Sequence, residues 1–136
     1  MCTRLATEPC MDKSNETRTI LVIEDDSRLR SGLRELLCQH GYEVVAVGNG
    51  DQGLDHLRAR RRTDLIFLDL RMPGMNGWQF RAEQKRDAAW AAIPVLVGTA
   101  DWNADGEARS LGAVACLKKP YNTRDLVETV RRCSAA

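Results

Sequence analysis

The sequence predicts an α/β domain in which a parallel sheet is covered by helices on both faces. Five short apolar runs alternate with segments whose apolar residues recur every three or four positions, the spacing of a helix with one buried face. The runs are rich in β-branched residues and do not alternate with polar residues, which is typical of strands buried on both faces. Five strand–helix units in succession indicate a doubly wound arrangement with right-handed crossovers.

The expected strands are the apolar runs themselves. None of the runs approaches the roughly 20 apolar residues that a membrane-spanning helix needs, so we expect no membrane insertion. The five expected strands are residues 20–23, 44–47, 65–68, 95–97 and 114–117.

The expected helices follow the strands in turn. In the first, leucines recur with helical spacing, Asp26 or Ser27 caps the start and Gly41 closes the helix. The remaining helices are expected from 51 to 60, from Gly77 onward, from 102 to 111 and from 123 to 133.

Length and charge indicate a protein of one domain that does not bind nucleic acid directly. A chain of 136 residues fits one ordinary domain, which we assign to residues 19–134, and the polar residues 1–18 are expected to form a flexible tail. The formal net charge of +1 argues against direct binding of nucleic acid, which usually requires a strong basic excess. Charged residues near the N-terminus leave no apolar core for a secretion signal, so we expect a cytoplasmic protein.

Side chains suited to metal and phosphate chemistry follow four of the five expected strands. Glu24 and Asp25 come directly after the first strand, and Asp69 comes after the third. Thr99 follows the fourth strand, and Lys119 follows the fifth. Because the carboxyl ends of parallel strands meet at one edge of a sheet, we expect these side chains to converge on one pocket.

Three carboxylates in one pocket need a compensating charge, since neighbouring like charges disfavour ionisation. Magnesium binds oxygen ligands and keeps several waters, so two or three carboxylates match its needs. A carboxylate is also a competent nucleophile toward phosphorus, a lysine adds positive charge, and a threonine hydroxyl donates a hydrogen bond. The set therefore predicts a site that accepts a phosphoryl group.

Each of these residues alone also has an ordinary explanation. Asp25 and Asp26 suit the start of a helix, Thr99 suits the end of a strand, and Lys119 suits a surface. Only the groups together, in order at strand ends, favour the phosphoryl site.

Four segments carry the site residues: ILVIEDDS (20–27), DLIFLDLRMPGMNG (64–77), GTA (98–100) and KKP (118–120). Together they resemble the receiver domain of two-component response regulators, of the chemotaxis-regulator type. The resemblance extends over residues 19–134. It implies a flavodoxin-like (βα)5 fold with a five-stranded parallel sheet in the strand order 2-1-3-4-5.

The resemblance implies that Asp69 accepts a phosphoryl group from the phosphohistidine of a sensor histidine kinase or a histidine phosphotransfer protein. Thr99 would bond to the phosphoryl group, and Lys119 would pair with it. The Lys119–Pro120 peptide bond would be cis. The chain would act as a phosphorelay switch, a regulatory domain rather than an enzyme.

The resemblance also implies a bound Mg²⁺ ion. Its ligands would be Glu24, Asp25 and Asp69, together with the backbone carbonyl of Arg71. Glu24 stands where the family more often has Asp, but glutamate remains an oxygen ligand.

The output surface is expected on the helix 102–111, the strand 114–117 and the helix 123–133, where an unidentified downstream protein would bind. Many receivers have a Tyr or Phe at the position of Cys116, and this ring turns inward upon phosphorylation. A cysteine has no ring to rotate, so we expect Thr99 to act directly on the helix 102–111.

Two other functions fit part of the pattern. A receiver fold used only as a phosphorylation-independent interaction module would not need the acids, Thr99 and Lys119. A phosphatase with an aspartyl-phosphate intermediate generally has a second acid two residues after the nucleophile. This chain has Arg71 there, which does not deprotonate near neutral pH. The phosphorylation-dependent switch therefore explains the residues best.

Overall fold

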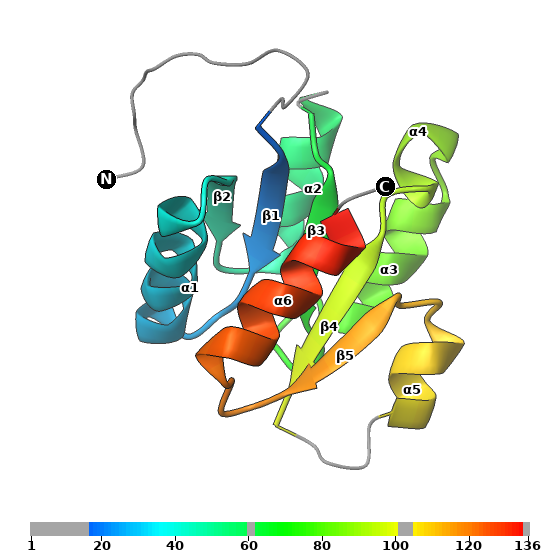
Figure 1. Ribbon diagram of the computed structural model, residues 1–136. Helices are drawn as coiled ribbons and strands as arrows, with labels where there is room; N and C mark the ends of the chain where they lie inside the picture. Colours follow the sequence, from blue (N-terminus) through cyan, green and yellow to red (C-terminus); the bar gives the residue numbers. More distant parts are fainter. Residues whose placement is uncertain (1–16, 60–61, 101–104, 135–136) are drawn as a thin grey trace.

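The computed structural model describes residues 17–59, 62–100 and 105–134. Within them, five parallel strands form one sheet in the order β2-β1-β3-β4-β5, with helices on both faces (Figure 1). This arrangement confirms the doubly wound, flavodoxin-like fold and the strand order that the resemblance implies. The strands are β1 (Thr19–Ile23), β2 (Glu43–Val47), β3 (Leu65–Asp69), β4 (Val95–Thr99) and β5 (Ala115–Lys118).

The helices lie close to the expected positions, with differences at their ends. α2 stops at Arg58 instead of residue 60, and a short additional helix, α4, precedes β4. Of the helix expected at 102–111, the structure describes α5 from residue 105, and residues 102–104 lie outside the described part. In that described part, no helix is long and apolar enough to cross a membrane. The helices are α1 (Ser27–Gln39), α2 (Gly50–Arg58), α3 (Gly77–Lys85), α4 (Ala88–Ala91), α5 (Asp105–Ser110) and α6 (Thr123–Ser134).

Local sequence signals explain where α1 begins and ends. The side chain of Asp26 accepts hydrogen bonds from the backbone N–H groups of Arg28 and Leu29 at 3.0 and 3.2 Å, as an N-cap does. Gly41 follows the helix with a φ of 93°, a left-handed conformation that glycine adopts without strain. Asp26 therefore fixes the loop between β1 and α1, which carries two of the acids of the expected pocket.

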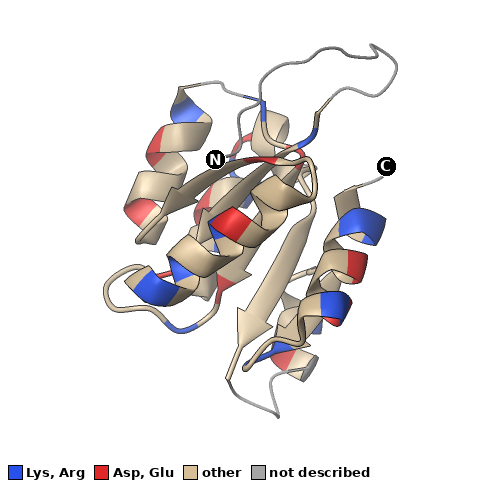
Figure 2. Cartoon of the chain, turned by 60° about the vertical axis from the view of Figure 1, so that its left-hand side comes forward, with Lys and Arg blue, Asp and Glu red and all other residues tan. Residues whose placement is uncertain are grey.

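Two apolar cores on opposite faces of the sheet explain the unbroken apolar runs. Successive residues of a strand point to opposite faces, so every position of a central strand is buried. In β3, Ile66 and Leu68 enter the core covered by α2, α3 and α5, whereas Leu65 and Phe67 enter the core covered by α1 and α6. Charged residues accordingly lie mostly on helices and loops (Figure 2).

A buried polar network joins α3, α4 and the end of α5. Nε of Arg81 donates a hydrogen bond to the backbone carbonyl of Leu111 at 2.9 Å, and its Nη1 donates to Oε1 of Gln84 at 2.8 Å. Nε2 of Gln84 donates to the backbone carbonyls of Trp90 and Ile93 at 2.7 and 3.1 Å. The network thereby adds side-chain hydrogen bonds to carbonyl groups at and just beyond the ends of α4 and α5.

Gln84→Ala is expected to lower the free energy of unfolding by about 2 kcal/mol, because it removes one buried hydrogen bond to Arg81 and two partly buried ones to backbone carbonyls. Urea unfolding followed by circular dichroism measures the change. Glu83→Ala is the matched control, since the neighbouring Glu83 forms a partly exposed ion pair with Arg86 at 3.3 Å. Its expected effect is below about 0.5 kcal/mol. Equal losses in the two variants would contradict the structural role of the network.

Candidate functional site

The carboxyl ends of β1 and β3 lie side by side and bring three acids together. Glu24 and Asp25 follow β1, and Asp69 is the last residue of β3. One carboxylate oxygen from each acid lies within 4.8 Å of those from the other two. The structure thus gathers acids that the sequence places at separate strand ends, at distances that suit one shared cation.

The three acids differ in burial. Glu24 and Asp69 are 2% and 4% exposed, whereas Asp25 is exposed to solvent. Oε2 of Glu24 accepts a hydrogen bond from the backbone N–H of Asp26 at 3.2 Å, and Oδ1 of Asp69 accepts one from the N–H of Arg71 at 3.3 Å. The pocket therefore has two buried carboxylates and a third acid at its rim.

A lysine faces the two buried acids. Nζ of Lys119 lies 3.1 Å from Oε1 of Glu24 and 3.4 Å from Oδ2 of Asp69. The backbone N–H of Lys119 donates to the carbonyl of Thr99 at 2.7 Å, and the Lys119–Pro120 peptide bond is cis, as the resemblance implies. One ammonium group thus faces two buried carboxylates, which leaves negative charge in excess.

This excess charge changes the proton affinity of the pocket. Burial, and then the charge of Glu24, raise the pKa of Asp69 from 3.8 to about 7, although Lys119 partly offsets both effects. Burial alone would lower the pKa of Lys119, but the charges of Asp69 and Glu24 outweigh it and raise this pKa above its usual 10.5. The lysine therefore stays charged at neutral pH, and the acids favour binding of a further positive charge.

Thr99 ends β4 at the same edge of the sheet. Gly98 and Asp69 face each other in the pairing of β3 with β4, so Thr99 lies one residue beyond this pair. Thr99 is 1% exposed. The structure therefore places a buried threonine at the edge of the sheet that carries the acids, and its role at the site stays a prediction.

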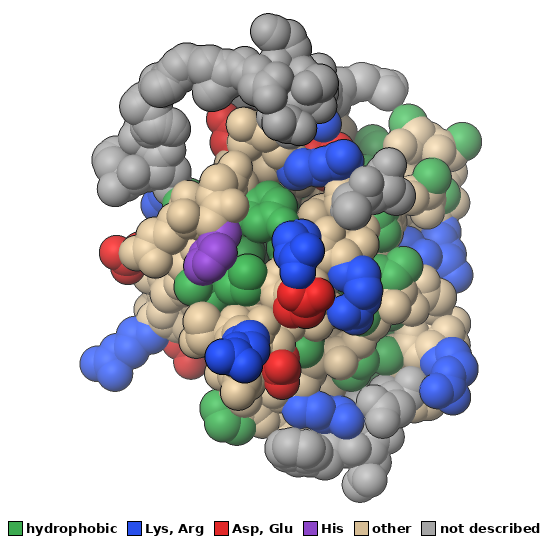
Figure 3. All heavy atoms as spheres, in the orientation of Figure 1, with side chains coloured by type: hydrophobic (Ala, Val, Ile, Leu, Met, Phe, Trp, Pro, Cys, Tyr) green, Lys and Arg blue, Asp and Glu red, His purple; other side chains and the backbone are tan. Residues whose placement is uncertain are grey.

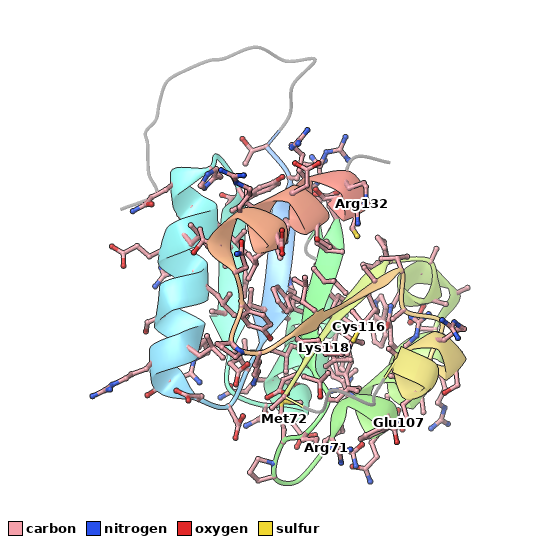
Figure 4. All side chains as sticks on the ribbon, turned by 60° about the horizontal axis from the view of Figure 1, so that its bottom comes forward. Arg71, Met72, Glu107, Cys116, Lys118 and Arg132 are labelled. Atoms are coloured by element: carbon pink, nitrogen blue, oxygen red, sulfur yellow. The ribbon has the colours of Figure 1, made fainter. Side chains whose placement is uncertain are left out.

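Arg71 connects the loop after β3 to two helices. Its Nη2 lies 3.7 Å from Oε1 of Glu107 in α5, and its guanidinium carbon lies 5.5 Å from the ring centroid of Trp78 in α3. Figure 4 shows Arg71 and Glu107 near each other at this end of the molecule. The expected role of the Arg71 carbonyl as a metal ligand stays a prediction.

Two further residues near the acids have no signal in the sequence pattern. Nη1 of Arg30 donates to the backbone carbonyls of Glu24 and Asp25 at 2.8 and 3.5 Å, which holds the acidic loop against α1. Tyr121 follows the cis peptide bond and packs against Phe67, with ring centroids 5.5 Å apart. Both contacts join residues from different elements or turns, so residue spacing alone does not reveal them.

An apolar groove between α1 and α6 reaches the pocket. Its walls include Leu29, Leu33 and Leu36 of α1 and Leu126 of α6, and Lys119 also lines it. Figure 3 shows hydrophobic side chains at the surface between these two helices. Lys119 therefore lines both the acidic pocket and the surface groove.

Comparison with known proteins places these features in a family. The chain matches the family model of the response regulator receiver domain over residues 20–131. Protein PilH of Pseudomonas aeruginosa is 33% identical over 113 residues, which cover 82% of this chain and 93% of PilH. The chemotaxis protein CheY4 of Vibrio cholerae has a similar structure, with a TM-score of 0.80, 27% identity and coverage of 87% of this chain and 99% of CheY4.

A third similar protein is the response regulator TrrA of Thermotoga maritima, solved in complex with Mg²⁺ and BeF. Its TM-score is 0.76 at 27% identity, over 86% of this chain and 99% of that one. Other curated relatives are longer: the chain spans 18% of a two-component response regulator from Arabidopsis thaliana and 55% of the transcriptional regulatory protein PdtaR from Mycobacterium tuberculosis. The chain is therefore similar to only a part of each of these longer proteins.

Asp69→Asn is expected to stabilise the metal-free protein at neutral and higher pH. The folded state releases the Asp69 proton near pH 7, whereas the unfolded chain releases it near pH 3.8. Between these values the folded state binds more protons, so this group's contribution to the free energy of unfolding falls as pH rises. The variant lacks this loss and should be more stable than wild type by on the order of 2 kcal/mol at about pH 8, and by much less at about pH 4.

Urea unfolding in EDTA at the two pH values measures the difference. Asp55→Asn is the control, because Asp55 is exposed in its ion pair with Arg58 and should change stability by less than about 0.5 kcal/mol at either pH. A variant at position 69 that is less stable than wild type at the higher pH would contradict the raised pKa.

Proposed function

Since the chain belongs to the response regulator receiver domain family, we propose that it is a phosphorylation-dependent switch in two-component signalling, with Asp69 as its phosphoacceptor. The observation that carries this proposal is the position of Asp69, which ends a central strand, lies 3.4 Å from Lys119 and shares its pocket with two further acids. A carboxylate held in this way offers a nucleophilic oxygen beside a cation that attracts an incoming phosphoryl group.

Mg²⁺ is the cofactor that suits the same pocket. Glu24, Asp25 and Asp69 would supply carboxylate oxygens, and the backbone carbonyl of Arg71 would supply another. All of these donors are oxygens, and the carboxylates lie close enough to share one ion. When bound, Mg²⁺ offsets the excess negative charge and attracts phosphoryl oxygens. The complex of TrrA with Mg²⁺ and BeF supports this choice.

Three residues of the chain would have separate roles in phosphoryl transfer. An oxygen of Asp69 attacks the phosphorus of a phosphohistidine, and the histidine nitrogen leaves with the electron pair of the broken P–N bond. Lys119 pairs with one phosphoryl oxygen, and the hydroxyl of Thr99 donates a hydrogen bond to another. Because the metal-free pocket raises the pKa of Asp69 to about 7, added positive charge favours its ionised, nucleophilic form.

The phosphodonor would be a sensor histidine kinase or a histidine phosphotransfer protein that docks on the groove between α1 and α6. The α1 wall of this groove carries three leucines, and Lys119 lines it while contacting Asp69. A helix that lays its apolar face in this groove would bring a histidine on that helix to the edge of the sheet where Asp69 lies.

The output surface would be the face formed by α5, β5 and α6, where a downstream protein binds. β5 is an edge strand with four half-buried residues, and Val114 just before it is 54% exposed. The ion pair between Arg71 and Glu107 joins the loop after Asp69 to α5. A change at Asp69 therefore has a short physical route to this face.

Incubation with acetyl phosphate and Mg²⁺ is expected to add one phosphoryl group to the chain. The gain should depend on Mg²⁺ and should be lost in Asp69→Asn, which has no carboxylate nucleophile. Intact-protein mass spectrometry measures it.

Asp64→Asn is the matched control, because Asp64 lies just before β3, at the opposite end of the strand from Asp69, and accepts a hydrogen bond from the N–H of Thr19. It should be labelled as wild type is. If no phosphoryl group is gained under conditions that label another receiver domain, the proposed function as a phosphorylation-dependent switch is wrong. A phosphorylation-independent interaction module would then explain the fold better.

Binding of beryllofluoride with Mg²⁺ is expected to change the hydrogen exchange of α5 amides more than that of α2 amides. The reason is that Arg71 and Glu107 connect α5 to the loop after Asp69. Hydrogen–deuterium exchange mass spectrometry measures both helices in one experiment. Glu107→Gln removes the charge of the pair and should reduce the change in α5 without preventing beryllofluoride from binding. An undiminished change in this variant would show that another contact carries the signal.

A further inference from the structure

The hydroxyl of Tyr121 is a buried donor without an acceptor. Among the residues that the structure describes, none forms a hydrogen bond with this oxygen, and solvent does not reach it. Buried hydroxyl groups nearly always have partners, because an unpaired one costs free energy. The Tyr121 hydroxyl can therefore donate a hydrogen bond to an acceptor other than those the described residues supply.

Gly98 provides the space that the hydroxyl occupies. A Cβ atom at position 98 would lie 1.9 Å from the Tyr121 oxygen, far inside van der Waals contact. No residue with a side chain fits there while the tyrosine keeps this position. Gly98 and Tyr121 thus form a matched pair that holds the hydroxyl against β4.

This position lies next to the side chain of Asp69. Gly98 faces Asp69 in the pairing of β3 with β4, and facing residues of parallel strands point to the same side of the sheet about 5 Å apart. Asp69 and Phe67 share that side, because residues two apart in a strand point the same way, and the Tyr121 ring packs on Phe67. The hydroxyl therefore lies about one strand spacing from the acid, without being bonded to it.

The hydroxyl keeps its proton at physiological pH. Burial, followed by the charges of Glu24 and Asp69, raises the pKa of Tyr121 well above its usual value of 10.0. Tyr121 is therefore a hydrogen-bond donor beside a group of carboxylates that would carry further acceptor oxygens after phosphorylation.

We propose that Tyr121 is a further binding residue for the phosphoryl group: its hydroxyl donates a hydrogen bond to a phosphoryl oxygen on Asp69, or to a fluorine of beryllofluoride in its place. The inference rests on the proposed role of Asp69 as phosphoacceptor. A phosphoryl group extends beyond the carboxylate and supplies the acceptor that the resting pocket lacks. Phosphorylation then satisfies a donor that is unpaired beforehand, which favours the phosphorylated state.

Tyr121→Phe removes the hydroxyl and keeps the ring. With saturating Mg²⁺, its affinity for beryllofluoride is expected to be about tenfold lower than that of wild type, the loss expected for one hydrogen bond to a charged group. Tryptophan fluorescence follows the titration. The affinity for Mg²⁺ alone should stay within about twofold, and the thermal midpoint should not fall, because the hydroxyl is unpaired in the resting state.

Tyr42→Phe is the matched control, since Tyr42 lies just before β2, at the amino end of the sheet and away from the acids. It should bind beryllofluoride as wild type does. The chain has two tyrosines, so labelling their Cζ atoms with ¹³C gives two NMR signals. Each Tyr→Phe variant lacks one of these signals, which assigns both. Beryllofluoride should shift the Tyr121 signal and leave the Tyr42 signal in place.

The outcomes separate this inference from the function on which it rests. If wild type neither binds beryllofluoride nor gains a phosphoryl group, the role of Asp69 is wrong and the inference falls with it. If wild type binds but Tyr121→Phe binds equally well, with no shift of the Tyr121 signal, only the inference is wrong. A variant that loses thermal stability and Mg²⁺ affinity together would show that the hydroxyl is structural, which also overturns the inference.

Discussion

The site depends on an imbalance of charge, in which two buried carboxylates share one ammonium group. Glu24 and Asp69 both lie within 3.4 Å of Lys119, and both are almost completely buried. Buried like charges are unfavourable unless positive charge compensates them. The apolar cores on both faces of the sheet hold the acids in this arrangement, so packing elsewhere stabilises a pocket that by itself would be unstable. A cation or a proton relieves the imbalance, which makes the pocket responsive to its ligands.

Two contacts connect this pocket and the adjoining elements to α5. Arg71, in the loop after Asp69, forms an ion pair with α5, and Arg81 binds the carbonyl of Leu111 just beyond its end. A helix of six residues has few internal hydrogen bonds, so its position depends strongly on such tertiary contacts. With Cys116 in place of a ring on β5, we propose that the contact of Arg71 and the residue Thr99 would connect the acids to the proposed output face.

Much of the fold and the identity of the acids could be predicted from local patterns. Apolar runs predicted all five strands to within two residues, because burial on both faces leaves a strong compositional pattern. Asp26 marked the start of α1, because an N-cap bonds only to residues two and three positions later. Glu24, Asp69 and Lys119 could be assigned to one edge, because parallel topology alone brings the carboxyl ends of strands together.

Other features depend on packing between distant parts of the chain. No pattern in the sequence indicated α4, the network of Arg81 and Gln84, or the pair of Gly98 and Tyr121. The sequence by itself determined the fold class and the charged residues at the strand ends, since both depend on periodicity and chain order. Only the tertiary structure decided how deeply the acids are buried, which charge faces them and which hydroxyl lies beside Asp69, since these depend on distances across neighbouring strands and helices.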